Sequence, residues 1–377
     1  MAALRVAVIG LGATGSAALW HLARRGVRAV GIERFDLGHP YGSSHGATRI
    51  IRLAHFENAA YVPLMRRAYT LWRELETAAA ARLIVTTGIA EIGSPDGPLV
   101  RGTVAGASRH DLPHEMIDAQ SLMRRYPAFN LPASFVAVLS PDGGYIAAEA
   151  ALAAHIRLAR AAGAAVRTRE TVLAVEPLAR GVRIRTDRGE IECDSAVLAA
   201  GPWMAKLLPD LARSLRVTRQ VVGWFEPVDE ARFSADRFPV FILESEHGLH
   251  YGFPVDAAMG AGLKIAKHHH RRQAVDPDSY DRTVSAADEA DIRAPLPDYL
   301  PAADGRLIGA QTCLYTMTPD ETFIIDRLPG FPHVVIASPC SGHGFKFSPA
   351  VGEILADLVT LGATDHDIGR FRLGRFG

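Results

Sequence analysis

Apolar positions in the first 35 residues follow the order strand, helix, strand. Residues 6–9 read Val-Ala-Val-Ile, as in a strand that is covered on both faces, and an Ala-rich helix follows to about residue 25. Gly26 ends this helix, and residues 28–32 form a second apolar strand that stops at Glu33. The order predicts a βαβ unit with two parallel strands.

The rest of the chain contains helical stretches and two kinds of strand region. Helical spacing is found over residues 61–75, 147–161 and 350–361. Strand-like runs cover 171–175, 182–185, 195–201 and 333–338, and residues 83–144 read as short strand-like pieces broken by Pro and Gly. Residues 216–315 look like a second, antiparallel region, with strands near 238–243, 250–254 and 262–267.

Two domains are expected, because one core stops growing at roughly 250–300 residues and the chain has 377. The pattern predicts an α/β fold whose Rossmann-like domain is discontinuous, over 1–82, 146–215 and 319–377. A second, mixed-sheet α+β domain then takes 83–145 and 216–318, so that the first domain is interrupted twice.

Composition and charge exclude several classes of protein. Lys+Arg and Asp+Glu both number 41, which favours neither a nucleic-acid partner nor a charged membrane surface. No run approaches the roughly 18 apolar residues of a membrane span. The three cysteines make a poor disulfide framework and suit a reducing compartment. We expect a cytoplasmic protein without a signal peptide.

The turn after the first strand has the glycine spacing of a dinucleotide site. Gly10 would allow a tight turn, Gly12 the approach of a pyrophosphate to the backbone, and Gly15 close packing of helix on strand. The helix N-terminus adds N–H donors and partial positive charge, and Glu33 would accept hydrogen bonds from a ribose. A purely structural glycine turn is the alternative, and the motif alone does not separate FAD from NAD.

A polar segment follows, with the sequence Gly-Ser-Ser-His-Gly-Ala-Thr-Arg-Ile-Ile-Arg over residues 42–52. It could be a solvated loop. However, Ile50 and Ile51 lie directly between Arg49 and Arg52, which indicates partial burial. Buried arginines need anionic or carbonyl partners, so the segment predicts a site that binds such groups.

This segment resembles the flavin-contacting segment of the monomeric sarcosine oxidase family, which includes N-methyltryptophan oxidase. Residues 312–320, Thr-Cys-Leu-Tyr-Thr-Met-Thr-Pro-Asp, are similar to the flavin-linking segment of that family. Residues 341–348, Ser-Gly-His-Gly-Phe-Lys-Phe-Ser, resemble its C-terminal signature. The resemblance implies a Rossmann-like FAD-binding domain with a substrate domain resting on the flavin, in a protein that is monomeric.

The resemblance and the glycine motif together give the cofactor-binding positions. These are Gly10, Gly12, Gly15, Glu33, Arg34, Ser43, His45, Thr48, Val172, Gly201, Cys313, Gly342, Gly344 and Lys346. By resemblance, Cys313 forms a thioether to the flavin ring and makes the FAD covalent. A buried, inert thiol is the alternative for Cys313, and it is the interpretation that we adopt for Cys193 and Cys340.

Other positions are assigned to substrate and catalysis. Arg52 and Lys346 would hold a substrate carboxylate, unless they form surface ion pairs. By resemblance, Arg49 lies beside the flavin ring, and Lys264 activates oxygen unless it lies on the open side of its strand.

The aromatic and histidine positions complete the predicted pocket. Tyr251 and Tyr315 would wall it, although either could be ordinary core. His268 matches the family's active-site histidine, but it begins a run of three histidines, so the assignment could slip by one residue. We expect no metal at this run, because no Cys, Asp or Glu adjoins it in ligand spacing.

The resemblance implies an oxidase of a secondary amino acid, with a small amino-acid substrate and O₂ as its partners. Sarcosine, other N-methyl amino acids and cyclic amino acids all fit a carboxylate clamp. A dehydrogenase that passes electrons to a quinone or carrier protein is an alternative. A catalytically idle flavin-binding protein is another, but it would need neither Arg52 nor Lys346.

Overall fold

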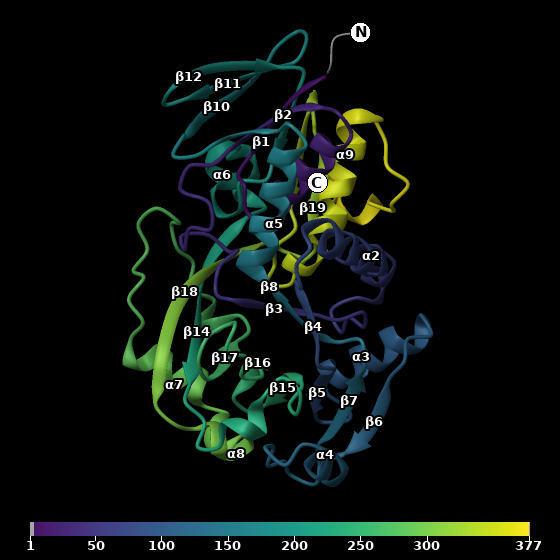
Figure 1. Cartoon of the computed structure of the whole chain (residues 1–377), viewed down its shortest axis with the longest axis vertical. Coiled ribbons are helices and arrows are strands. Elements are labelled where there is room, and N and C mark those ends of the chain that lie inside the picture. Colours follow the sequence, from purple (N-terminus) through teal and green to yellow (C-terminus); the bar gives the residue numbers. More distant parts are fainter. Residues whose placement is uncertain (1–3, 377) are drawn as a thin grey trace.

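The computed structural model describes residues 4–376. A six-stranded sheet lies at one end of the molecule (Figure 1). Its strands, in spatial order, are β19 (Ile324–Leu328), β20 (Phe331–Ser338), β13 (Ser195–Leu198), β1 (Arg5–Ile9), β2 (Arg28–Ile32) and β9 (Ala165–Arg167). All neighbours are parallel except β19 and β20. The predicted βαβ unit is confirmed, with β1 and β2 in register.

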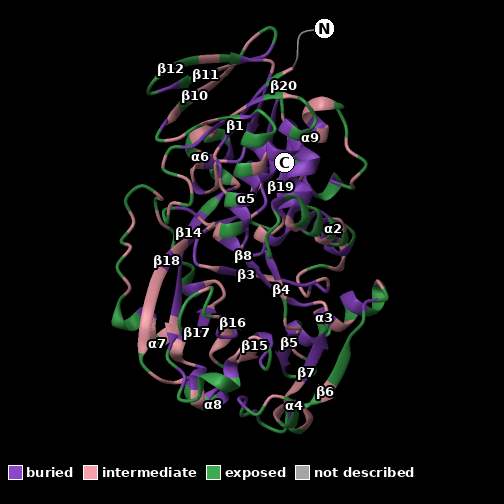
Figure 2. Cartoon of the chain, viewed as in Figure 1, coloured by how far each residue is buried: buried purple, intermediate pink, exposed green. Residues whose placement is uncertain are grey.

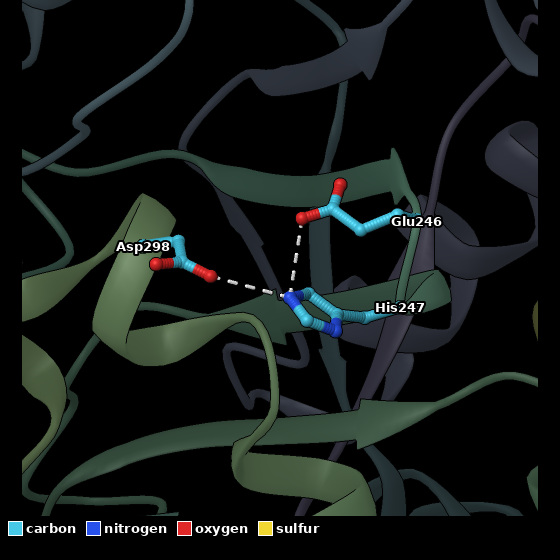
Figure 3. A group of neighbouring side chains, drawn as sticks. All are labelled: Glu246, His247 and Asp298. Atoms are coloured by element: carbon cyan, nitrogen blue, oxygen red, sulfur yellow. Dashed lines mark hydrogen bonds and ion pairs between the residues drawn. The ribbon is translucent and has the colours of Figure 1, made fainter.

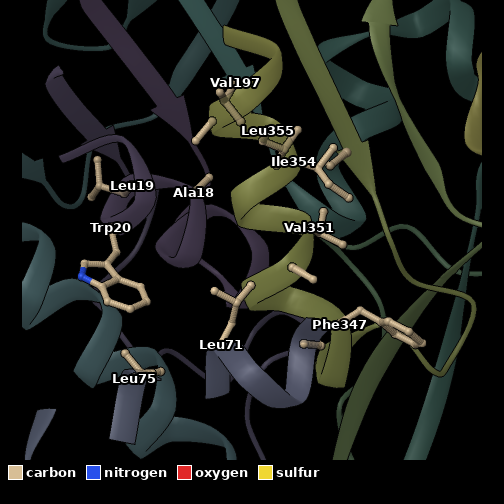
Figure 4. Close-up of a cluster of buried hydrophobic side chains, with 14 of the residues drawn as sticks. Ala18, Leu19, Trp20, Leu71, Leu75, Val197, Phe347, Val351, Ile354 and Leu355 are labelled. Carbon is tan, nitrogen blue, oxygen red and sulfur yellow. The ribbon is translucent and has the colours of Figure 1, made fainter. Parts of the chain in front are cut away.

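Four helices cover one face of this sheet. They are α1 (Ala13–Arg24), α2 (Val62–Ala79), α5 (Ala148–Ala161) and α9 (Ser348–Thr360). Figure 4 shows α1 beside α9, with Ala18 on the side of α1 that faces α9, within a core that also takes Val6 and Val8 from β1. Buried residues are dense on α9 and the strands beneath it (Figure 2).

A small antiparallel sheet covers the other face. Its strands are β10 (Val172–Pro177), β11 (Val182–Thr186) and β12 (Gly189–Cys193), and the short α6 (Met204–Leu207) lies nearby. Ala7 and Ile9 of β1 pack here with Val182 and Ile184 of β11. Alternate residues of β1 thus enter two different cores, which explains the unbroken apolar run in the sequence.

The second large sheet is mixed, as predicted. Its eight strands, in spatial order, are β18 (Leu307–Met317), β14 (Arg216–Phe225), β17 (Leu263–Lys267), β16 (Gly248–Phe253), β15 (Val240–Ser245), β5 (Ile89–Gly93), β7 (Val136–Ser140) and β6 (Glu115–Asp118). Its strands are antiparallel except where β15 runs parallel to β5. The sheet therefore joins strands from two separate stretches of chain.

A three-stranded sheet lies between the two large ones (Figure 1). It consists of β3 (Thr48–Ile51), β8 (Gly144–Ala147) and β4 (Ile84–Thr86). The strands of the two large sheets fall on the two sides of the predicted domain division, whose boundaries stay a prediction. No helix among residues 4–376 is long and apolar enough to cross a bilayer.

Residues 83–144 contain two helices where the sequence pattern predicted only short strands. They are α3 (Pro98–Arg109) and α4 (Ala119–Arg125). Gly102 weakens the helical pattern of α3, and its place is explained by packing: a Cβ there would lie 2.6 Å from the carbonyl oxygen of Phe56. Two further helices, α7 (Ala286–Arg293) and α8 (Leu296–Tyr299), interrupt the second region.

Candidate active site

A cavity of about 500 Å³ runs from the βαβ unit to the face of the eight-stranded sheet. Most of the predicted site residues line it. They are Gly10, Gly12, Glu33, Arg34, Ser43, His45, Arg49, Arg52, Val172, Gly201, Tyr251, Lys264, His268, Cys313, Tyr315, Gly342, Gly344 and Lys346. Gly15 and Thr48 are not among the lining residues, and both have other roles that the structure makes clear.

The glycine turn shapes one end of the cavity. Gly10 has φ +86°, and a Cβ there would lie 2.6 Å from the carbonyl oxygen of Ala199. A Cβ on Gly15 would lie 1.8 Å from the carbonyl oxygen of Gly10, which confirms its packing role. Helix α1 begins after Gly12 with no side-chain cap from that residue. Gly12, Ala13 and Thr14 line the cavity, so the α1 N-terminus adjoins it, as an anionic pyrophosphate requires.

Glu33 faces the same end of the cavity as a fixed hydrogen-bond acceptor. Its carboxylate accepts from the backbone N–H groups of Leu11 (2.9 Å) and Phe35 (3.1 Å). Burial raises the pKa of Glu33, but hydrogen bonds from His39 and Leu11 outweigh burial and lower it overall. Glu33 is therefore an ionised acceptor beside the cavity.

A strap of residues 273–285, which lies between β17 and α7 in the chain, reaches this end of the cavity, and the sequence pattern gave no sign of it. Asp278 lines the cavity and accepts hydrogen bonds from Arg34 (2.6 Å), Trp203 Nε1 (2.7 Å) and Lys206 (2.5 Å). Burial alone would raise the pKa of Asp278, but these donors, Lys206 first, lower it to about 2. The strap rises alongside β18 in Figure 1.

Arg49 is held by carbonyl groups. Its guanidinium donates to the carbonyl oxygens of Ser43 (2.9 Å), His45 (2.5 Å) and Thr48 (2.8 Å). No carboxylate in residues 4–376 forms an ion pair with it. The predicted carbonyl partners are confirmed, and the charge of Arg49 stays directed at the cavity.

Lys264 is buried, with 4% of its surface exposed, so the alternative of a lysine on an open strand face is wrong. Its Nζ donates to the carbonyl oxygens of Gly46 (2.5 Å) and Thr48 (2.8 Å) and to the hydroxyl of Thr48 (3.0 Å). Burial, and then the charge of Arg49, lower the pKa of Lys264 well below its usual value. Three oxygen acceptors nevertheless suit the ammonium form. Thr48 thus anchors Lys264.

Arg52 and Lys346 are both buried, which rules out surface ion pairs for them. Arg52 Nη2 donates to both carboxylate oxygens of Glu57 (2.9 and 2.8 Å), and its Nη1 lies 3.3 Å from Glu91. Lys346 donates to the carbonyl oxygen of His343 (3.0 Å), and burial followed by the charge of Arg52 lowers its pKa to about 7. Glu57 and Glu91 were missed by the sequence analysis.

Aromatic side chains meet beside these cations. The hydroxyls of Tyr251 and Tyr315 lie 3.5 Å apart, and the rings of His268 and Tyr315 are 5.7 Å apart. A Cβ on Gly342 would lie within 2.7 Å of both Tyr315 and His268, so only glycine lets this backbone pass. Burial, and then His269, lower the pKa of His268 to about 3, so its ring is neutral at physiological pH.

The histidine run divides among three environments. His268 lines the cavity, His269 lies 3.5 Å from Glu321, and His270 lies 2.9 Å from Asp288. The register predicted for His268 therefore places it on the cavity without a slip.

One group of side chains among residues 4–376 has ligand atoms close enough to share a metal ion. It consists of Glu246, His247 and Asp298, and Figure 3 shows the imidazole between the two carboxylates. None of the three lines the cavity. Because both carboxylates are largely exposed and already pair with His247, the group is an ordinary surface ion-pair cluster.

The three cysteines are free. Cys313, on β18, and Cys340 both line the cavity, whereas Cys193 is buried with its sulfur 3.7 Å from the carbonyl oxygen of Val182. Burial raises the pKa of Cys313, while Arg49 and then Lys264 act to lower it. The two cations favour its thiolate.

The cavity fits FAD. One end has the glycine turn, the α1 N-terminus and Glu33, which suit a pyrophosphate and a ribose. In the middle, both ring nitrogens of His45 are buried without a hydrogen-bond partner in the described part of the chain. A polar ring edge in the cavity would satisfy them.

Comparison with known proteins supports FAD as the cofactor. A model of the DAO family, described as FAD dependent oxidoreductase, matches residues 5–358. Monomeric sarcosine oxidase from Bacillus sp. (strain NS-129) is 41% identical over 98% of this chain and 96% of its own length. N-methyl-L-tryptophan oxidase from Salmonella dublin is 36% identical over 98% of both chains.

A solved structure also resembles the chain throughout. It is NikD, described as an unusual amino acid oxidase essential for nikkomycin biosynthesis, with a TM-score of 0.86 and 28% identity. The match covers 98% of this chain and 97% of NikD. The chain belongs to the DAO family of FAD-dependent oxidoreductases, together with monomeric sarcosine oxidase and N-methyl-L-tryptophan oxidase.

Proposed function

We propose that the chain is an FAD-dependent oxidase of a secondary amino acid, N-methylated or cyclic, such as sarcosine. The observation that carries the proposal is the pair of buried cations, Arg52 and Lys346, at the opposite end of a cavity that begins at a dinucleotide turn. Arg52 already pairs with Glu57 and Glu91, whereas Lys346 donates to the carbonyl oxygen of His343 and pairs with no carboxylate of residues 4–376, and a buried cation is costly unless an anion joins it. A substrate carboxylate supplies that anion.

Arg52 binds this carboxylate through its planar guanidinium, and Lys346 adds a second charge. A guanidinium can form two parallel hydrogen bonds to a carboxylate, whereas an ammonium acts as a point charge. Arg52 already holds Glu57 in this manner at 2.8 and 2.9 Å. Because Glu57 also lines the cavity, a substrate carboxylate can take its place at the guanidinium.

His268, Tyr251 and Tyr315 surround the amine. The amine must be uncharged to react, and a neutral His268 ring can accept its proton through Nε2 or Nδ1. The two tyrosine rings exclude water and confine the N-alkyl group. Bound FAD supplies the two-electron acceptor that oxidises the C–N bond to an imine, which water then hydrolyses.

Lys264 serves oxygen. Three hydrogen bonds fix its Nζ beside the cavity, close to Arg49. A fixed positive charge stabilises the negative charge that develops on O₂ as it accepts electrons. Reduction of O₂ by two electrons and two protons gives H₂O₂.

Cys313 would hold the FAD through a thioether, whose C–S bond replaces a C–H bond of the flavin and an S–H bond of the cysteine; the two electrons released would pass to O₂. The thiol lies on the cavity, and the nearby Arg49 and Lys264 favour the thiolate that such a bond requires. Cys340 also lines the cavity, but its neighbours include no cation that lowers its pKa. This difference favours Cys313 as the attachment point.

We further propose a cytoplasmic monomer that divides into domains at the boundaries given above. Three free cysteines suit a reducing compartment. The name of the sarcosine oxidase relatives supports a monomer. The separate large sheets on either side of the boundaries support the division.

Mixing the purified protein anaerobically with a panel of N-alkyl and cyclic amino acids tests the activity. At least one member should bleach the flavin absorbance, and admitting O₂ should restore the colour with stoichiometric peroxide. Recovery with a quinone dye but not with O₂ would identify a dehydrogenase. Absence of bleaching with every compound, in a fully FAD-loaded sample, would leave only flavin binding.

A further inference from the structure

Glu91 is a carboxylate in an unusual position. It lies on β5, an interior strand of the eight-stranded sheet, beside the guanidinium of Arg52. It is completely buried, and neither of its oxygens accepts a hydrogen bond of good geometry from the described residues. Its closest charged partner is Arg52 Nη1, 3.3 Å from Oε1. Unlike Glu57, it does not line the cavity. A buried carboxylate with so little support needs a reason.

The surroundings of Glu91 offer few groups to stabilise its charge. The hydroxyl of Thr103 on α3 faces Glu91 and acts as a donor to lower its pKa, whereas Oδ2 of Asp142 between β7 and β8 is buried without a partner in residues 4–376. The charged and titratable groups that face Glu91 from its neighbouring elements are Arg52, Glu57, Asp142 and, at longer range, Lys346. Arg52 is thus the one close cation, and it is shared with Glu57.

A bound substrate changes the charge balance of this cluster. With every group ionised, Glu57, Glu91 and the substrate carboxylate face only Arg52 and Lys346. An uncompensated negative charge in a buried cluster is costly, so one carboxylate should take up a proton. Glu57 is partly exposed and can therefore stay ionised after the substrate carboxylate replaces it at Arg52, whereas Glu91 is completely buried.

We propose that Glu91 is a positioning residue that holds Arg52 from behind and takes up a proton when the substrate carboxylate binds. The inference rests on the proposed role of Arg52 in binding that carboxylate. The substrate carboxylate replaces Glu57 at Nη2 of Arg52, while Glu91 stays beside Nη1 and holds the guanidinium in position. Uptake of a proton by Glu91 then keeps the loaded cluster neutral.

The titration of Glu91 agrees with this role. Burial raises its pKa to about 7, even though Arg52 acts in the opposite direction. A bound carboxylate raises it further, because like charges disfavour ionisation. Glu91 is therefore partly ionised in the free protein at neutral pH and protonated in the complex.

Calorimetry of the FAD-loaded protein tests the proposal with methoxyacetate, in which an ether oxygen replaces the substrate N–H. Without an amine, the ligand contributes no amine proton and cannot be oxidised at a C–N bond. Titration at pH 7 in phosphate and in Tris, which differ in protonation enthalpy, gives the number of protons taken up. Glu91 and Lys346 both have a pKa of about 7, and a bound carboxylate raises the pKa of each, so we expect each to take up about 0.5 proton per site in the wild type.

Matched variants locate the proton. Glu91→Gln keeps the shape of the side chain but cannot titrate, so uptake should fall by about 0.5 proton per site and the remainder should be that of Lys346. Asp142→Asn, which alters the neighbouring carboxyl, should retain the wild-type uptake. Thermal melting and the flavin spectrum verify that each variant is folded.

Uptake in Glu91→Gln that equals the wild-type value, together with its disappearance in Lys346→Met, would assign the proton to the lysine alone and overturn the proposal. Lack of uptake in the wild type between pH 6 and 9 would do so as well. If Glu91→Gln does not fold, persistence of uptake in both Lys346→Met and Asp142→Asn supports Glu91. If Arg52→Lys leaves methoxyacetate affinity unchanged, the carboxylate clamp itself is wrong, and this inference fails with it.

Discussion

Replacement of Lys264 by methionine separates the two half-reactions of the proposed oxidase. The substitution keeps most of the side-chain volume and removes the charge that three oxygen atoms hold in place. Loss of one preorganised electrostatic group costs about 2.7–4 kcal/mol, or 10²- to 10³-fold in rate. We expect reoxidation of the reduced flavin by O₂ to slow by that factor and reduction by substrate to change much less.

The effect on stability should be small by comparison. The carbonyls of Gly46 and Thr48 each lose one donor but keep another, the backbone N–H of Thr48 and the guanidinium of Arg49, so each loss costs less than the roughly 1–3 kcal/mol of an unsatisfied group. Methionine also removes the cost of burying an ammonium, which is several kcal/mol in the opposite direction. A slowed reoxidation with a nearly unchanged melting temperature would therefore report the charge and not a damaged fold.

Stopped-flow spectroscopy measures the two steps apart. Anaerobic mixing with substrate follows reduction, and mixing the pre-reduced protein with O₂ follows reoxidation. Since burial lowers the pKa of Lys264, its ammonium is lost as pH rises, so wild-type reoxidation should slow with rising pH. The Lys264→Met rate should not depend on pH through this group.

Lys267 provides the matched control, because it lies on the same strand but does not line the cavity. Lys267→Met should leave both rates near those of the wild type. If Lys264→Met abolishes reduction and leaves reoxidation intact, Lys264 belongs to the amine site, and another cation such as Lys346 must serve oxygen.

Three further substitutions test the site. Arg52→Lys keeps a positive charge for Glu57 and Glu91 but loses the planar guanidinium. KM should rise about 10- to 100-fold, because charge-assisted hydrogen bonds contribute about 1.5–3 kcal/mol. An unaltered KM in steady-state kinetics would place the substrate carboxylate elsewhere. Cys313→Ser should release its flavin on acid precipitation, while the wild type and Cys193→Ser give yellow pellets; a colourless wild-type pellet contradicts a covalent link. In the Cys313→Ser background, Asp278→Asn should speed FAD dissociation about 10-fold, because Arg34 and Lys206 lose a charged acceptor on the strap. Flavin fluorescence measures the dissociation rate. Equal rates for Asp278→Asn and the strap control Asp281→Asn would show that the strap does not retain FAD.

The elements that hold the glycine turn were predictable because their burial is simple. Residues of β1 enter cores on both faces of the sheet, so the strand appears as an unbroken apolar run. Helix α3 was not predictable in the same way. Gly102 is demanded by the approach of Phe56, a contact between distant residues that leaves no local signal in the sequence.

The cavity residues were found mainly through resemblance, and the groups behind them were missed. Within the run Ile-Ala-Glu-Ile, Glu91 looks like a residue on the solvent side of a strand. It is buried because β5 lies inside a sheet and directly behind Arg52. Asp278 lies in a polar run typical of an exposed loop, and only the tertiary structure brings it to Arg34 and Lys206.

The eight-stranded sheet also limits how this protein can be recombined with its relatives. Strands β5 to β7 and strands β14 to β18 come from separate stretches of chain, yet β5 and β15 pair side by side in the finished sheet. A substrate pocket therefore cannot be transplanted as one contiguous fragment. A chimera that exchanges substrate preference needs crossovers at both ends of both stretches. A single crossover between β5 and β15 would pair a strand from one parent protein with a strand from the other, next to the carboxylate clamp.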